Sequence, residues 1–252
     1  MPLWLLFVIT LAAVLASIEI GYRWADRRQA RARREVEAPI GAMVGSTLGL
    51  LAFLLAVTFG IASEAFHDRK VAVVDEANAI RTSYLQTALI PQPQRGEIRR
   101  LLREYTNERL RWANVPKIPQ TRSAIALQSL LWQQTAVVGQ NSSDVVALFV
   151  ESMNQTFDLR AKREMLRVRS RIPAGYIIAL LTITVLAHVS MGYHVGVAGT
   201  ARSPVMLLVG ITFSLVILLI FDLDRPGEGL INVSQNSMID LRNWMTTAQP
   251  FP

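Results

Sequence analysis

The chain of 252 residues contains no cysteine and only three histidines. Without thiols it forms no disulfides, no cysteine-ligated zinc or iron–sulfur site, and no thiol nucleophile. The histidines (His67, His188 and His194) form no H-E-x-x-H pair, and the sequence has no phosphate-binding loop or nucleophile elbow. We therefore expect neither an enzyme nor a resident cofactor.

Charged residues are also scarce at 18%, whereas apolar residues make up 51% of the chain. Soluble proteins carry roughly 25% charged residues. A helix needs about 20 apolar residues to cross the hydrocarbon core of a bilayer. Four stretches reach this length: 2–22, 39–63, 172–201 and 203–221. The sequence therefore predicts an all-α fold with four transmembrane helices, embedded in a lipid bilayer.

The first stretch is an anchor rather than a cleaved signal peptide, because its basic residues follow it instead of preceding it. A polar segment separates the second and third stretches and predicts a helical-bundle soluble domain inserted between these spans. We accordingly divide the chain into four parts. Residues 1–63 contain the helices at about 2–22 and 39–63 and an arginine-rich loop, and residues 64–171 form the soluble domain. Residues 172–222 contain helices three and four, and residues 223–252 form a tail with an amphipathic helix.

Proline placement and apolar spacing predict the helices of the polar regions. No proline lies between Pro39 and Pro91, which favours one long helix through the second span and beyond it. Segment 95–115 places these residues on one face: Ile98, Leu101, Leu102, Tyr105 and Trp112. Segment 121–140 carries Ile125, Leu130, Leu131 and Val137. The tail spaces Met238, Leu241, Trp244 and Met245 as in an amphipathic helix on a membrane surface.

With four spans, both chain termini and residues 64–171 lie on the same side of the membrane. Six arginines in loop 22–37 favour a cytoplasmic position for that loop, by the positive-inside rule. Basic residues flank spans two and three on the opposite side: Arg69, Lys70, Arg160, Lys162, Arg163, Arg167, Arg169 and Arg171. The sidedness therefore stays open. We expect these residues to meet lipid head groups and not nucleic acid.

The second span carries a stripe of small residues: Gly41, Gly45, Gly49, Ala52, Ala56 and Gly60. Small residues let helix backbones approach closely in lipid. The stripe packs either against the chain's own helices or against the same span of further copies around an axis. In the second case Phe53, Leu55 and Phe59 are candidates for a hydrophobic constriction of a pore.

Charged residues cluster at two membrane exits. Asp68, Arg69, Asp75 and Glu76 follow the second span, and Asp222, Asp224 and Arg225 follow the fourth. Each group forms either ion pairs or a cation site. Two carboxylates such as Asp222 and Asp224 suit a hard cation, for example Ca²⁺. For His188, inside the third stretch, we favour a hydrogen bond to a backbone carbonyl over a functional role.

Four strings carry a resemblance to a known family: residues 48–60 (LGLLAFLLAVTFG), 74–78 (VDEAN), 221–226 (FDLDRP) and 233–235 (VSQ). With the four-span layout, the sequence resembles a family of bacterial membrane proteins described as bestrophin-like, over nearly the whole chain. Bestrophins proper are pentameric ion channels, mostly anion-conducting, with a helical domain between spans two and three. In the animal channels an acidic segment placed like Asp222 and Asp224 binds Ca²⁺.

The resemblance implies an oligomeric ion channel in a bacterial inner membrane, conducting anions and assembled as a pentamer. Its partners would be the bilayer, inorganic ions and further copies of the chain. The alternative is a non-conducting membrane sensor or assembly protein, whose helical domain binds a partner or a small ligand.

Overall fold

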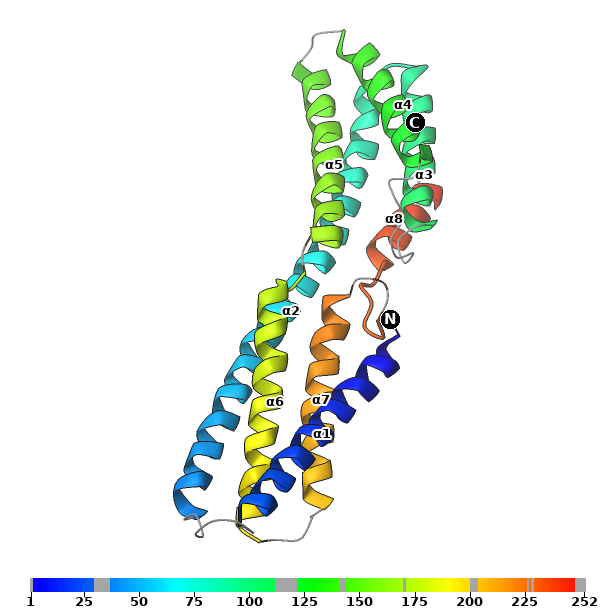
Figure 1. Ribbon diagram of the computed structural model, residues 1–252. Coiled ribbons are helices and arrows are strands. Elements are labelled where there is room, and N and C mark those ends of the chain that lie inside the picture. The colour runs from blue at the N-terminus through cyan, green and yellow to red at the C-terminus, as the bar shows by residue number, and fades with distance from the viewer. Residues whose placement is uncertain are drawn as a thin grey trace. The chain divides into compact units, whose positions relative to one another are not determined.

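The computed structural model describes residues 2–29, 37–111, 122–140, 144–169, 171–199, 204–225, 227 and 229–247. Within these ranges the chain is helical and contains no strand, as predicted (Figure 1). The elements are α1 (Leu3–Gln29), α2 (Glu37–Gln86), the 3-10 turn η1 (Thr87–Leu89), α3 (Gln94–Arg111), α4 (Arg122–Gly139), α5 (Asp144–Arg169), α6 (Ala174–Val197), α7 (Pro204–Asp224) and α8 (Asn236–Thr247).

Four helices are long and apolar enough to cross a membrane. They occupy Leu3–Arg28, Pro39–Leu89, Ala174–Val197 and Pro204–Asp224. The second of these runs through α2 into η1, and α2 itself is one continuous helix of 50 residues, as the absence of proline predicted. The chain is therefore a multi-pass membrane protein with four transmembrane helices.

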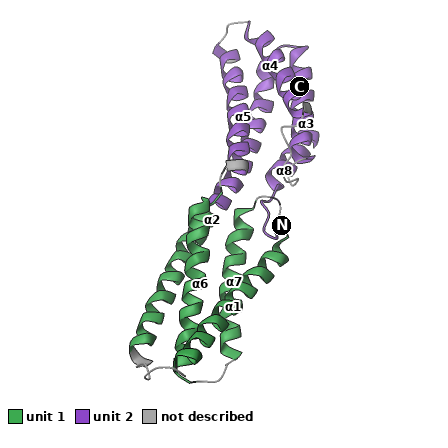
Figure 2. Ribbon diagram, viewed as in Figure 1, with its two compact units in different colours: residues 1–64, 171–225 green, residues 65–170, 226–252 purple. Residues whose placement is uncertain are grey.

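The chain divides into two compact units (Figure 2). Unit 1 comprises residues 1–64 and 171–225, and unit 2 comprises residues 65–170 and 226–252. Unit 1 therefore holds α1, α6, α7 and the apolar part of α2. Unit 2 combines the polar part of α2 with α3, α4, α5 and α8.

In unit 1, α1 and α6 cross at glycines. A Cβ atom added to Gly192 would lie 2.0 Å from the carbonyl oxygen of Ile18, and one added to Gly21 would lie 2.0 Å from that of Val189. Both positions exclude any side chain, because the obstacle is backbone. The two helices thus pack backbone to backbone, as small residues permit in lipid.

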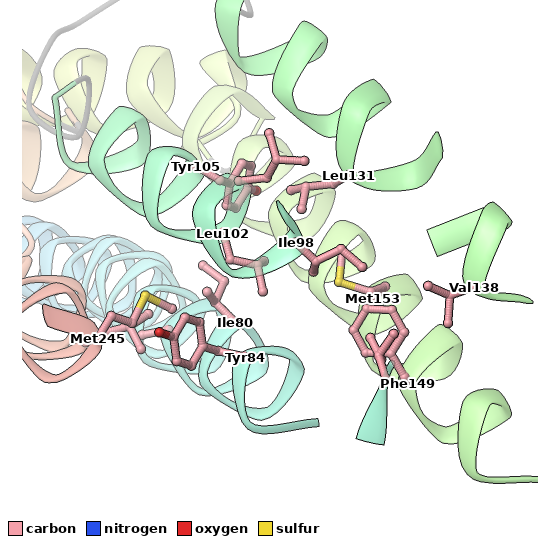
Figure 3. Close-up of a cluster of buried hydrophobic side chains, with 14 of the residues drawn as sticks. Ile80, Tyr84, Ile98, Leu102, Tyr105, Leu131, Val138, Phe149, Met153 and Met245 are labelled. Carbon is pink, nitrogen blue, oxygen red and sulfur yellow. The ribbon is translucent and has the colours of Figure 1, made fainter. Parts of the chain in front are cut away.

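Unit 2 has an apolar core to which all of its helices contribute (Figure 3). The predicted face of α3 is confirmed, since Ile98, Leu101, Leu102 and Tyr105 are buried; Trp112 lies outside the described residues. On α4, Leu131 is buried, whereas Ile125, Leu130 and Val137 are exposed.

The predicted membrane-surface role of the tail helix is wrong. Met238, Leu241 and Met245 of α8 are at most 4% exposed, because they pack into the core of unit 2. The Trp244 ring meets the Tyr84 ring edge-on, with 5.6 Å between the centroids. The amphipathic pattern reports burial against protein, so this face is not available to lipid.

Candidate functional site

The small-residue stripe on α2 is largely uncovered in the described part of the chain. A Cβ atom added to Gly45, Gly49 or Gly60 would meet nothing within 4 Å. Ala52 and Ala56 are likewise exposed. Gly41 differs, because a Cβ atom there would lie 3.2 Å from the His194 ring. Apart from Gly41, the stripe is therefore free to pack against a second molecule.

The three aromatic and aliphatic pore candidates do not share one face of α2. Phe53 is 63% exposed and Phe59 38% exposed, whereas Leu55 is only 5% exposed. At roughly 100° per residue, Phe53 and Leu55 point in nearly opposite directions. Phe53 lies beside the open glycine stripe, and Leu55 packs within the chain.

Leu55 and Phe59 instead line an apolar groove between α2 and α7. The groove encloses about 450 Å³. Its walls consist of Ala52, Leu55, Ala56 and Phe59 from α2 and Thr212, Phe213, Val216 and Leu219 from α7. Ala52 and Ala56 border both the groove and the open stripe, so the two features are continuous on α2.

His188 lies behind the α7 wall of this groove. Its ring is perpendicular to that of Phe213, with 5.1 Å between the centroids. Nδ1 lies 2.7 Å from the carbonyl oxygen of Thr184, one turn earlier in α6. This geometry confirms the predicted hydrogen bond to a backbone carbonyl, with the proton on Nδ1.

Glu76 forms the centre of a buried ion-pair cluster in unit 2. Its side chain is fully buried. Arg109 donates to both carboxylate oxygens, at 2.7 and 3.1 Å, and Arg163 donates to Oε2 at 2.5 Å. The Tyr105 hydroxyl lies 3.3 Å from Oε1. Two guanidinium groups and a phenol therefore satisfy one carboxylate and tie α2 to α3 and α5.

Electrostatics keeps Tyr105 in its donor form. Burial disfavours the phenolate, and the neighbouring Glu76 carboxylate disfavours it further, so the pKa of Tyr105 is raised well above its ordinary value. The second guanidinium nitrogen of Arg163 donates to Oε1 of Gln235 at 2.7 Å. The cluster therefore also fixes the segment that leads into α8.

The other charged candidates after the second span, Asp68, Arg69 and Asp75, differ in their burial and in their contacts. Asp75 lies 4.0 Å from Lys162 on α5, in a partly exposed pair. Arg69 is buried, whereas Asp68 is exposed. Glu76 and Asp75 each form ion pairs with side chains of neighbouring helices.

Asp222 and Asp224 are both buried at the end of α7. Oδ1 of Asp224 accepts a hydrogen bond of 2.8 Å from the backbone N–H of Ile172. Ca²⁺ takes six to eight oxygen ligands, and the described residues contain no cluster of three His, Asp or Glu side chains. The hydrogen bond of Asp224 joins the end of α7 to the segment that leads into α6.

Sequence reasoning missed the partners of Glu76. The sequence presents Arg163 as a membrane-flanking charge and Tyr105 as part of an apolar helix face, and no motif in it singles out Arg109. Glu76 lies 33 residues from Arg109 and 87 residues from Arg163 in the chain, so no local sequence pattern predicts these ion pairs. Among the described residues that contact Glu76 or its arginines, only Gln235 lies in a string that carries the family resemblance, the VSQ string at 233–235.

A family model and solved structures relate the chain to the same family. The family model described as Bestrophin-like domain matches residues 8–238. A point variant of a bacterial bestrophin homologue from Klebsiella pneumoniae aligns with a TM-score of 0.67 at 15% identity, over 98% of this chain and 99% of that one. A structure of the Klebsiella pneumoniae homologue solved by zinc phasing aligns with a TM-score of 0.62 at 14% identity, over 98% of this chain and 99% of that one. No curated protein matches the sequence.

Proposed function

The chain belongs to the Bestrophin-like domain family, and from this premise we propose that it forms an oligomeric ion channel in a bacterial inner membrane. Copies of the chain pack around an axis, and α2 of each copy lines the pore. By family resemblance the oligomer is a pentamer and the conducted ions are anions. Both termini and residues 64–171 face the same side of the membrane.

The observation that carries this proposal is the open stripe on α2. Gly45, Gly49 and Gly60 have no neighbour where a side chain would stand, although glycines of α1 and α6 in the same unit are in backbone contact. Glycines are costly in a helix, where each is about 1 kcal/mol less favourable than alanine. An uncovered row of them favours close contact with another helix, which further copies of α2 supply.

Phe53 is the residue that we place at the pore constriction. It lies beside the stripe and is 63% exposed. A ring of apolar side chains at the axis gates a pore by dewetting. Phe59 flanks it on the groove side, and the buried Leu55 supports α2 from behind.

The test is ion flux through liposomes that contain the purified protein. Chloride and potassium efflux are measured for the native chain, for Phe53→Trp and for empty liposomes. Ile178→Trp is the matched control, because Ile178 is similarly exposed (65%) but lies on α6. We expect flux at least several-fold above empty liposomes, altered by Phe53→Trp and unchanged by Ile178→Trp.

Two results contradict the proposal. Equal effects of the two tryptophans would remove Phe53 from the pore. No flux from a well-folded oligomer would favour the alternative function, a non-conducting sensor or assembly protein, and would leave the family fold without channel activity.

A further inference from the structure

Five arginines gather on one face of unit 2, where η1, α3 and α8 meet the end of α2. We refer to Arg81, Arg95, Arg99, Arg103 and Arg242 as the arginine face. None of them belongs to the Glu76 cluster or to the proposed pore. Arg81, Arg103 and Arg242 are exposed.

Two aromatic rings hold three of these guanidinium groups in place. The Cζ atom of Arg81 lies 4.7 Å from the ring centroid of Trp244. The Cζ atoms of Arg99 and Arg103 lie 5.3 and 5.9 Å from that of Tyr84. Tyr84 itself packs beside Met245 of α8 (Figure 3). Stacking of this kind positions guanidinium groups without neutralising their charge.

The hydrogen-bond acceptors of the arginine face carry no formal charge. Arg95 donates to the carbonyl oxygens of Ile90 and Ala88, and Arg99 donates to the hydroxyl of Thr87. Arg103 donates to the carbonyl oxygen of Arg99, and Arg242 donates to the Asn243 amide oxygen.

The arginine face forms no ion pair in the part of the chain that the structure describes. No Asp or Glu oxygen forms a salt bridge with any of the five arginines there. The acidic residues Glu97 and Glu104 of α3 pair instead with Arg100. Among the described residues, five guanidinium groups therefore lie close together without an ion-pair partner, which favours an anionic ligand.

A small hollow between α3 and α8 lies within this face. It encloses about 130 Å³ and is lined by Arg103, Asn107, Arg242, Met245 and Thr246. Two guanidinium groups from different helices and the Asn107 amide supply donors at its rim, and Met245 supplies an apolar wall. Guanidinium groups match phosphate oxygens with paired hydrogen bonds.

We propose that this hollow binds a phosphate group, with the rest of the arginine face receiving further negative charge of the same ligand. A monovalent anion would leave most of the five charges unmatched, whereas a phosphate ester or pyrophosphate carries several charges and several acceptor oxygens. The phosphate belongs either to a soluble compound or to a lipid head group. The proposal is independent of channel activity.

The experiment is a calorimetric titration of the full-length protein in nanodiscs of zwitterionic lipid, with pyrophosphate as the probe. We expect saturable binding with one site per chain. The double variant Arg103→Gln/Arg242→Gln should weaken it at least tenfold. Arg100→Gln is the matched control, because Arg100 is an exposed arginine of α3 that pairs with Glu97 and Glu104; it should change the affinity less than twofold.

A second arm identifies the source of the phosphate. Nanodiscs that contain phosphatidic acid should reduce the pyrophosphate affinity if the head group reaches the hollow, and should leave it unchanged if the natural ligand is soluble. The proposal is overturned by the absence of saturable binding. It is also overturned by equal losses in the double variant and Arg100→Gln, which would indicate non-specific attraction to positive charge.

Discussion

At the scale of single residues, Glu76 shows how a buried charge is accommodated. A carboxylate removed from water is costly unless it is paired and hydrogen-bonded. Glu76 meets that condition through Arg109, Arg163 and Tyr105. Each partner comes from a different turn or helix, so the pairing depends on the complete packing of unit 2.

We predict that Glu76→Gln destabilises the protein, because it keeps the shape but leaves two guanidinium groups without a counter-charge. Breaking a buried ion pair costs about 3–5 kcal/mol, which corresponds to a decrease in melting temperature of roughly 6–20 °C. Thermal unfolding followed by circular dichroism in detergent measures it. Glu97→Gln, in an exposed pair with Arg100, is the control and should have a much smaller effect. Equal decreases would show that Glu76 contributes no more than a surface ion pair.

Asp224 presents a second prediction at this scale. Its carboxylate accepts the Ile172 N–H, so Asp224→Ala leaves a buried donor unpaired, at a cost of about 1–3 kcal/mol. We expect a lower melting temperature for Asp224→Ala in buffer that contains a calcium chelator. If Asp224 served only as a calcium ligand, the substitution would lower the melting temperature in the presence of Ca²⁺ alone.

At the scale of helices, glycine has two distinct uses in unit 1. Gly21 and Gly192 allow α1 and α6 to touch backbone to backbone, whereas Gly45 and Gly49 on α2 face open space. The same residue type therefore marks an internal contact in one pair of helices and an available surface on another. Only the neighbours of each glycine distinguish the two uses.

Gly192→Ala should therefore disrupt the fold, since its new Cβ atom would stand 2.0 Å from the Ile18 carbonyl oxygen. Overpacking of this kind costs typically 1–3 kcal/mol and sometimes more. Gly49→Ala is the matched control: nothing obstructs its Cβ atom, so it should leave the isolated chain at least as stable as before. Melting temperature and the yield of monodisperse protein measure both variants. A Gly192→Ala protein as stable as the control would contradict the close crossing of α1 and α6.

At the scale of the whole molecule, the open stripe of α2 is where we expect copies of the chain to meet. The chain contains no cysteine, so a single introduced thiol reports contacts between copies without background. We predict that Gly49→Cys forms disulfide-linked dimers upon mild oxidation in membranes. Ile178→Cys, exposed on α6, should form far fewer. The measurement is non-reducing gel electrophoresis, and equal cross-linking of the two variants would argue against the stripe as the contact surface.

The sequence by itself determined the four spans and most helix ends. A bilayer requires about 20 consecutive apolar residues, and proline is tolerated in the first turn of a helix but disfavoured in its interior. Pro91 follows η1, and Pro173 directly precedes α6. These properties are local, and a single stretch of chain contains all the information. Apolar spacing likewise predicted the buried face of α3, because the apolar residues that recur with the helical period are the ones that are buried there.

Only the tertiary structure decided what each surface faces. Spacing could not tell that the apolar side of α8 packs into unit 2 instead of lipid, because both environments select the same residues. Nor could it tell that Leu55 is buried while Phe53 is open, or that Glu76 meets Arg163 across 87 residues. Contacts between distant segments depend on which helices pack together, and that is a property of the folded chain.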